Sequence, residues 1–196
     1  MITKTQSLPI LEPYLFVLNQ LIFEAFEAYF LVTEGKETTY CSRTRTAMIN
    51  DHMIELANER LVPMPGVVKI EACDRTLFEI GGEVLLHFKK LDANLKPSNY
   101  RTQTAIRFNN NLELDGIPSE LPRIQVGYVP KDDWTSIIGA FAAYNGSRGW
   151  SIDITGHIAG IQDIELDIAE CASISEDVPG ITVKPEAIPA KQSKKA

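Results

Sequence analysis

The stretch that decides the fold is "RTLFEIGGEVLLHFKKL", which runs from Arg75 to Leu91. Two short apolar-rich runs flank Gly81 and Gly82, and a Gly-Gly pair between such runs is a strong signal for a two-residue β-hairpin turn. We therefore predict a hairpin here, with Ile80 and Glu83 paired on either side of the turn.

Counting outward from this turn sets the register of the predicted hairpin. Thr76 then lies opposite His87, and Asp74 lies opposite Lys89, so these four side chains share one face at the open end of the hairpin. A slip of one residue would move one strand's side chains to the other face and separate the four.

Two helices are predicted before the hairpin. From Leu11 to Phe30 the apolar residues recur three or four positions apart, which is typical of a helix with one buried face. A second helix is expected from Ser42, as its N-cap, to about Leu61. Pro9 and Pro13 suit the first turn of the first helix or its entry.

A short helix and three strands are predicted after the hairpin. The segment "NYRTQTAIRFNNN" (residues 99–111) is expected to be helical, with Thr102 or Ser98 as its cap. The runs "RIQVGYV", "SIIGAFAAYN" and "GWSIDI" are joined by short loops, which favours an antiparallel three-stranded meander. Residues 1–155 are thus expected to form one α+β domain whose strands make one sheet, and residues 156–196 an extension that is largely disordered from about Ser173.

Composition excludes several classes of protein. The chain has 196 residues and a formal net charge of -7, which argues against a general nucleic-acid coat or a polybasic membrane binder. Its three cysteines lie far apart and suggest reduced, structural thiols, and no histidine cluster suits zinc, so we expect no metal and no cofactor. Without a signal peptide or 18 continuous apolar residues, a cytoplasmic location and no membrane contact are predicted.

One basic segment stands out in this acidic chain, because Leu85–Asn111 carries five cations against the single acid Asp92. Cations at a strand end and near a helix N-terminus can hold phosphate together with the backbone N–H groups, and an aromatic ring can stack on a base. A second indication of anion binding is "SRTRT" (residues 42–46). Its arginines lie at a predicted helix start, where the helix dipole disfavours cations unless an anion compensates. The candidate anion or partner-binding residues are Arg43, Arg45, Lys89, Lys90, Asn99, Tyr100, Arg101, Thr102, Gln103 and Arg107. The alternative is a solvated surface whose cations pair with nearby acids.

An enzymatic alternative centres on Asp74, His87 and Lys89. An acid on one strand and a lysine on its neighbour resemble metal-dependent nucleases, in which Asp and a Glu-x-Lys hold Mg²⁺ and orient the attacking water. His87 replaces the second carboxylate, which weakens the hypothesis because Mg²⁺ prefers oxygen ligands. A simple cross-strand ion pair between Asp74 and Lys89 is the other interpretation.

The motifs "TRT", "HFKKLD", "NYRTQ", "GY" and "WSIDI", between about residues 40 and 155, resemble a family of poorly characterised bacterial and prophage proteins. Members are often encoded beside helix-turn-helix repressors, some fused to a metallopeptidase-like domain, which implies a role in toxin-antitoxin, phage-defence or prophage-regulatory modules. The positions that match are Arg43, Arg45, Lys89, Lys90, Asn99, Thr102 and Gln103. The chain departs from the family at His87, where Arg is expected, and at Ile154, where Leu is expected.

The leading hypothesis is therefore a non-enzymatic protein that acts with a regulator or toxin and uses its basic segment to hold a partner protein or nucleic acid. The nuclease is the second hypothesis. The third is a plain interaction module whose first helix forms a homodimer or docks a partner through Phe23, Phe26 and Phe30.

Overall fold

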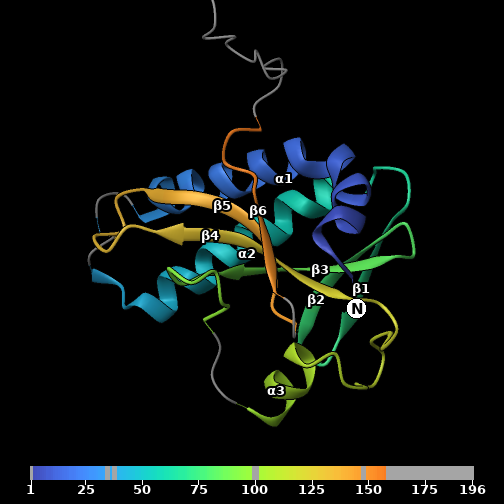
Figure 1. Cartoon of the computed structure of the whole chain (residues 1–196). Helices are drawn as coiled ribbons and strands as arrows, with labels where there is room; N and C mark the ends of the chain where they lie inside the picture. The colour runs from blue at the N-terminus through green and yellow to red at the C-terminus, as the bar shows by residue number, and fades with distance from the viewer. Residues whose placement is uncertain (1, 34–35, 37–38, 99–101, 147–148, 158–196) are drawn as a thin grey trace, which may run out of the picture. The chain divides into compact units, whose positions relative to one another are not determined.

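The computed structural model describes residues 2–33, 36, 39–98, 102–146 and 149–157. They form an α+β fold, as predicted, with helices packed on a mixed sheet (Figure 1). The helices are α1 (Lys4–Thr33), α2 (Ser42–Arg60) and α3 (Gln103–Asn109). The strands are β1 (Val67–Ala72), β2 (Arg75–Ile80), β3 (Val84–Lys90), β4 (Arg123–Pro130), β5 (Ile137–Tyr144) and β6 (Trp150–Asp153). Residues 158–196, which make up most of the predicted extension, lie outside the described residues.

Helix α1 begins well before Leu11, where the apolar periodicity had placed it. The Gln6 side-chain oxygen accepts a hydrogen bond from the Thr3 N–H at 3.0 Å, and Thr3 Oγ1 accepts one from the Gln6 N–H at 3.3 Å. This reciprocal capping box satisfies N–H groups that the helix start would leave unpaired. Pro9 and Pro13 consequently lie inside the helix and not at its entry.

The apolar side of α1 forms the centre of the main core. Leu11, Leu18 and Ile22 are fully buried there, against α2 and one face of the sheet. By length and hydropathy alone α1 could also cross a membrane, but a buried core helix of a soluble protein passes the same test. A cytoplasmic location therefore stays a prediction.

Helix α2 lies against α1 and on the same face of the sheet (Figure 1). Ile49 and Met53 are fully buried, as the periodicity indicated. The Arg60 guanidinium, near the end of α2, donates two hydrogen bonds, of 2.7 and 2.6 Å, to the Glu24 carboxylate of α1. The same contact lowers the pKa of Glu24. The start of α2 differs slightly from the prediction, because Cys41 occupies the N-cap position and Ser42 is the first helical residue.

The sheet has the order β1-β2-β3-β4-β5-β6. Neighbouring strands are antiparallel except β3 and β4, which run parallel. The predicted hairpin plus three-stranded meander therefore does not match the sheet in detail, because the apolar-rich run "VVKIEA" of β1 pairs with β2, and β4 joins β3 by parallel pairing. A parallel pair needs a long crossover, and residues 91–122, which contain α3, provide it.

The hairpin of β2 and β3 forms where it was predicted, but its register is wrong by one residue. Ile80 pairs with Val84, so the loop contains Gly81, Gly82 and Glu83. Both glycines have positive φ, and the Glu83 N–H donates to the Ile80 carbonyl at 3.0 Å. A three-residue loop uses glycine in this left-handed region as readily as a two-residue loop does.

The crossover covers the face of the sheet opposite α1 and α2, where a smaller second core forms from Leu77, Leu85, Phe108 and Ile117. Thr102 is the N-cap of α3, as predicted, and its hydroxyl accepts a hydrogen bond from the Ala105 N–H at 3.1 Å. Both faces of β3 are therefore covered: its even-numbered side chains face α1 and α2, and its odd-numbered ones face α3.

Candidate anion-binding surfaces

The two adjacent lysines of β3 point to opposite faces of the sheet. Lys90 lies over the ring of Trp134, a residue of the main core beneath α1 and α2. Lys89 lies on the face of α3, where Arg75 and His87 are its electrostatic neighbours. The alternation of side chains along a strand therefore splits the basic segment into two separate clusters.

The first of these, the Trp134 cluster, consists of Ser42, Arg45, Lys90 and Trp134. Lys90 Nζ lies 4.9 Å from the centroid of the indole ring, and Arg45 Cζ lies 5.3 Å from it. Lys90 Nζ is also 3.5 Å from Ser42 Oγ, at the first residue of α2. Each cation–π contact contributes about 0.5–1 kcal/mol at exposed sites and more where water is excluded. One aromatic ring thus holds together two cations from distant parts of the sequence.

Trp134 itself is fixed in place by the loop between β4 and β5. Its side chain is only 7% exposed, and its backbone N–H donates to the Lys131 carbonyl at 3.0 Å. Its φ of 59° is unusual for a bulky residue, and such strain is retained only where the surroundings impose it. The indole is therefore a support for the two cations and is not available to stack on a base.

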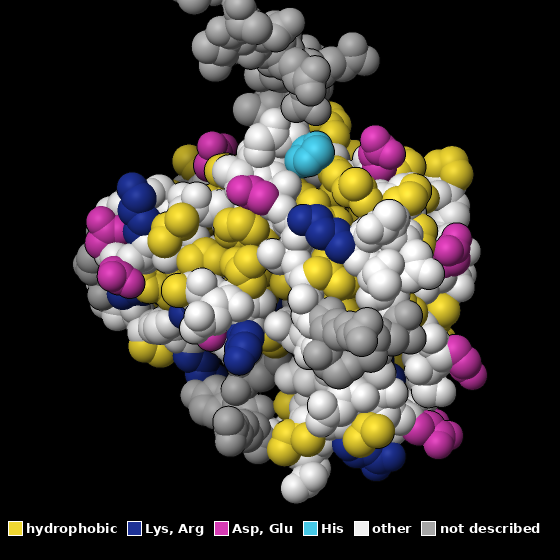
Figure 2. Space-filling model, in the orientation of Figure 1, with side chains coloured by type: hydrophobic (Ala, Val, Ile, Leu, Met, Phe, Trp, Pro, Cys, Tyr) yellow, Lys and Arg dark blue, Asp and Glu magenta, His cyan; other side chains and the backbone are white. Residues whose placement is uncertain are grey.

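The start of α2 adds to the positive potential at the Trp134 cluster. The first turn of this helix contains no acidic residue, and the N-cap Cys41 makes no capping hydrogen bond through its side chain. The helix dipole therefore adds partial positive charge beside Arg43 and Arg45. Figure 2 shows Lys and Arg side chains at the lower left, over the start of α2, with acidic side chains further up the same edge.

Two groups at this helix start have shifted pKa values. Burial lowers the pKa of Lys90. The pKa of the Cys41 thiol is lowered chiefly by a hydrogen bond with Thr44, whose hydroxyl lies 3.4 Å from Sγ. Cys41 is exposed at the N-cap position of α2, so a structural role there would not be one of core packing.

The remaining candidates of the basic segment do not join the Trp134 cluster. Thr102 caps α3, and Gln103 is exposed at the first residue of that helix. Arg107 is exposed and donates a hydrogen bond to the Glu113 carbonyl at 2.8 Å, on the opposite side of the sheet from Lys90. Asn99, Tyr100 and Arg101 lie outside the described residues.

The arrangement on which the nuclease hypothesis depended is not present. Asp74 is not opposite Lys89; it is an exposed turn residue with φ of 56° in the hairpin of β1 and β2, in which Ala72 pairs with Arg75. Continuing the observed register of β2 and β3 places Arg75, not Asp74, opposite Lys89. Within the described part of the chain, no group of three His, Cys, Asp or Glu side chains is placed to hold a metal ion.

His87 is a buried core residue. Its Nδ1 lies 3.2 Å from Gln125 Oε1. Its ring packs against the Phe108 ring in a T-shaped arrangement, with centroids 4.9 Å apart. Its pKa is lowered well below the usual value, first by burial and then by the charges of Lys89 and Arg75. A neutral imidazole packed in this way is suited to structure and not to acid–base exchange with solvent.

The second basic group, the Phe108 cluster, consists of Arg75, His87 and Arg123 around Phe108. Lys89 belongs to the same face of the sheet, and its charge lowers the pKa of His87. The guanidinium carbons of Arg75 and Arg123 lie 5.0 and 4.8 Å from the Phe108 ring centroid. Sequence reasoning missed both arginines. Each begins a strand, Arg75 in β2 and Arg123 in β4, and no local pattern reveals that a crossover helix will bring Phe108 between them.

Arg123 has a clear structural role in this cluster. It is 3% exposed and donates hydrogen bonds to the carbonyls of Phe108 at 2.9 Å and Leu112 at 3.0 Å. A longer contact, 3.4 Å, reaches the Arg107 carbonyl. Carbonyls at the end of a helix carry partial negative charge, so they compensate this buried cation and hold α3 to the sheet.

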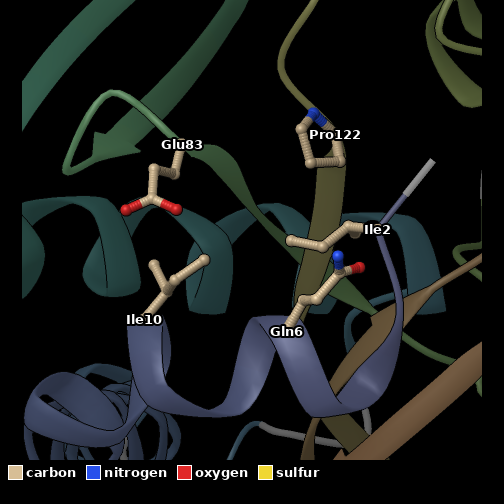
Figure 3. A pocket seen from close by; sticks show the side chains of 5 residues that line it. All are labelled: Ile2, Gln6, Ile10, Glu83 and Pro122. Carbon is tan, nitrogen blue, oxygen red and sulfur yellow. The ribbon is translucent and has the colours of Figure 1, made fainter.

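A separate pocket lies near the start of α1. Ile2, Gln6 and Ile10 line it together with Glu83 of the β2–β3 loop and Pro122, and its volume is about 390 Å³ (Figure 3). The apolar Ile2 and Ile10 side chains face the single carboxylate of Glu83 across this space. The pocket holds no cluster of groups that could carry out chemistry.

Comparisons with known proteins give no family for the chain: no family model matches it, and no curated protein or solved structure matches significantly.

Proposed function

We propose that this chain is a non-enzymatic component of a phage-defence, toxin-antitoxin or prophage-regulatory module, and that it binds an anionic face of its partner through the Trp134 cluster. The type of module rests on the resemblance of the sequence motifs. The binding rests on one observation: Lys90 and Arg45 converge on a single indole ring beside the start of α2, whose first turn contains no acidic residue.

The geometry favours recognition of charge over recognition of base sequence. Arg43, Arg45 and Lys90 provide three cations near backbone N–H groups of α2, a combination that suits phosphate or carboxylate. Trp134 is too buried to stack on a base. Nucleic acid would therefore be held through its phosphates, and an acidic protein surface would be held through the same side chains.

A homodimer through α1 has less support. Phe26 is buried in the main core, where it contacts Tyr29, Phe30 and Tyr128, and Phe23 packs against the same core. A partner could reach only the parts of Phe23 and Phe30 that this packing leaves exposed.

The proposal is tested by fluorescence anisotropy with labelled single-stranded and double-stranded DNA and RNA over a salt series. If three cations each neutralise one phosphate, the slope of log K against log salt should be about -2 to -3. Lys90→Ala should weaken binding and flatten this slope by about 0.7–0.9. Lys96→Ala is the matched control, because Lys96 belongs to the same basic segment but is exposed outside the cluster.

The same two variants separate a protein partner from nucleic acid. If no nucleic acid binds, an acidic partner that co-purifies with the chain should lose affinity with Lys90→Ala and keep it with Lys96→Ala. Equal binding of every candidate partner by Lys90→Ala and by the parent protein would end the proposal. Far-UV circular dichroism of each variant checks that the fold is intact.

A further inference from the structure

Strand β1 forms one edge of the described sheet, so only one side of its backbone pairs with a neighbouring strand. An edge strand presents a row of N–H and C=O groups that can pair with another chain. In an antiparallel ladder these groups alternate, because every second residue directs them toward the neighbour and the others direct them away. The pairing of β1 with β2 therefore decides which residues of β1 present them outward.

The hairpin of β1 and β2 fixes this alternation. It turns through Cys73 and Asp74, which both have positive φ, as a two-residue loop of type I′ requires. In such a hairpin the closing pair, Ala72 and Arg75, exchanges backbone hydrogen bonds, and so does every second pair after it. The even-numbered residues of β1 therefore direct their backbone groups toward β2.

The far end of the ladder agrees with this alternation, because the Gly81 N–H donates to the Gly66 carbonyl at 2.7 Å. The odd-numbered residues Lys69 and Glu71 consequently direct their N–H and C=O groups away from β2, toward the open edge. In the described part of the chain, no backbone hydrogen bond from outside the hairpin reaches either residue. The edge is thus open at these two positions.

The side chains of β1 make this edge complementary to a second copy of itself. Lys69 and Glu71 lie on one face of the strand and form an ion pair of 2.6 Å between Nζ and Oε1. A lysine on an edge strand discourages pairing with another chain, because its charge would be buried without a partner. Glu71 provides that partner here. On the other face, Val68 is 53% exposed, which leaves apolar surface at the same edge.

We propose that β1 is a homodimer interface, in which the β1 strands of two copies of this chain pair antiparallel about a two-fold axis at Ile70. This register places Lys69 of each copy opposite Glu71 of the other. Both residues direct their backbone groups outward, so each of these pairs can exchange both of its N–H···O bonds. On the other face, Val68 would lie opposite Ala72 of the second copy, which covers its exposed surface.

Charge selects this register over its neighbours. A shift of two residues, which keeps the outward backbone groups paired, would place Lys69 opposite Lys69 or Glu71 opposite Glu71. Like charges directly opposite each other on neighbouring strands are destabilising. The two-fold arrangement also uses each β1 edge once, so assembly through this edge stops at a dimer. The interface does not involve the Trp134 cluster, so this proposal and the proposed function can fail separately.

The test is sedimentation velocity of the full chain over a concentration series, which should detect a dimer in equilibrium with monomer. Lys69→Glu and Glu71→Lys each place like charges opposite each other in both symmetry-related pairs. Each should weaken dimerisation on the order of tenfold. The double variant Lys69→Glu/Glu71→Lys should dimerise like the parent. Lys96→Glu is the control, because it makes the same change in net charge at an exposed position outside β1.

An equimolar mixture of the two single variants is the sharpest form of the test. In the mixed dimer the acids of Lys69→Glu lie opposite the lysines of Glu71→Lys, so the mixture should dimerise more tightly than either variant alone. Amide hydrogen exchange gives a second measurement. The N–H groups of Lys69 and Glu71 should be protected only where the dimer forms, whereas the Ile70 N–H, which bonds to β2, should be protected in monomer and dimer alike.

Three results would overturn the proposal. The first is a parent protein that stays monomeric over the whole concentration series. The second is a dimer that Lys69→Glu leaves unchanged, which would place the interface elsewhere, for example on α1. The third is a mixture of the single variants that associates no better than its components. Lys90→Ala should leave dimerisation unchanged, and far-UV circular dichroism checks that each variant is folded.

Discussion

The burial of His87 predicts a specific sensitivity of this protein to acid. The ring is 5% exposed, contacts Phe108 and has the cations Lys89 and Arg75 as neighbours. Gln125, whose Oε1 lies 3.2 Å from His87 Nδ1, is neutral, and Arg123 lies over the same phenyl ring. Protonation inside this group would add a charge where no acid compensates, so His87 stays neutral in the folded protein well below its usual pKa of 6.5.

The sign and size of the effect follow from proton linkage. Because the folded-state pKa is depressed, the unfolded chain binds a proton at His87 that the folded chain does not, and stability falls as the pH drops below 6.5. The slope approaches about 1.4 kcal/mol per pH unit while His87 remains neutral in the folded state. Lowering the pH from 7.5 to 5.5 should therefore remove on the order of 1 kcal/mol from the free energy of unfolding through this residue alone.

The measurement is urea unfolding of the parent, His87→Gln and His52→Gln at both pH values. Glutamine keeps a polar group near Gln125 but cannot titrate. His87→Gln should therefore lose less stability than the parent between the two pH values, by on the order of 1 kcal/mol, whatever its own cost in stability. His52→Gln controls for removal of a histidine from a helix surface. If the parent and His87→Gln lose the same free energy, His87 is not a buried neutral group and the reasoning is refuted.

Three further substitutions test the fold around the two clusters, each by urea unfolding. Gly127→Ala should cost about 3 kcal/mol or more, because a Cβ there would lie 1.6 Å from the Lys89 carbonyl oxygen and must push β3 and β4 apart. Thr102→Ala should cost about 1 kcal/mol through loss of the α3 cap, with faster hydrogen exchange confined to α3; global acceleration would contradict this. Arg123→Met should cost about 2–4 kcal/mol, because it leaves the carbonyls of Phe108 and Leu112 unpaired; a neutral effect would mean that water replaces the guanidinium.

The helices and the hairpin could be predicted because their signals are local. Periodicity located α1 and α2, two glycines located the hairpin, and Thr102 was correctly considered as the α3 cap. The start of α1 was missed although the Thr3-x-x-Gln6 capping box is visible in the sequence. The parallel pairing of β3 and β4 depends on how residues 91–122 pack, and no local pattern carries that information.

The register of the hairpin was wrong for a physical reason that lies in β3 itself. A strand with one solvated face has a clear alternation that fixes its register, but both faces of β3 are covered, one by α1 and α2 and the other by α3. Two-residue and three-residue loops are then equally compatible with the apolar pattern. The two loops differ in whether Glu83 belongs to the strand or to the loop, and the structure places it in the loop.

That one-residue difference in register changes which side chains lie next to the lysines of the basic segment. In the predicted register Lys89 meets Asp74 and is neutralised, which leaves Lys90 as the cation of interest. In the structure the continued register places Arg75 opposite Lys89, and the charge of Arg75 lowers the pKa of Lys89. Lys90 reaches the Trp134 ring, which Arg45 also contacts, on the other face of the same strand. Adjacent lysines on a strand covered on both sides cannot serve one ligand, because the sheet separates them. Substitutions at Lys89 and Lys90 should therefore have independent, additive effects on binding, and strong non-additivity in the double variant would mean that one ligand reaches both faces.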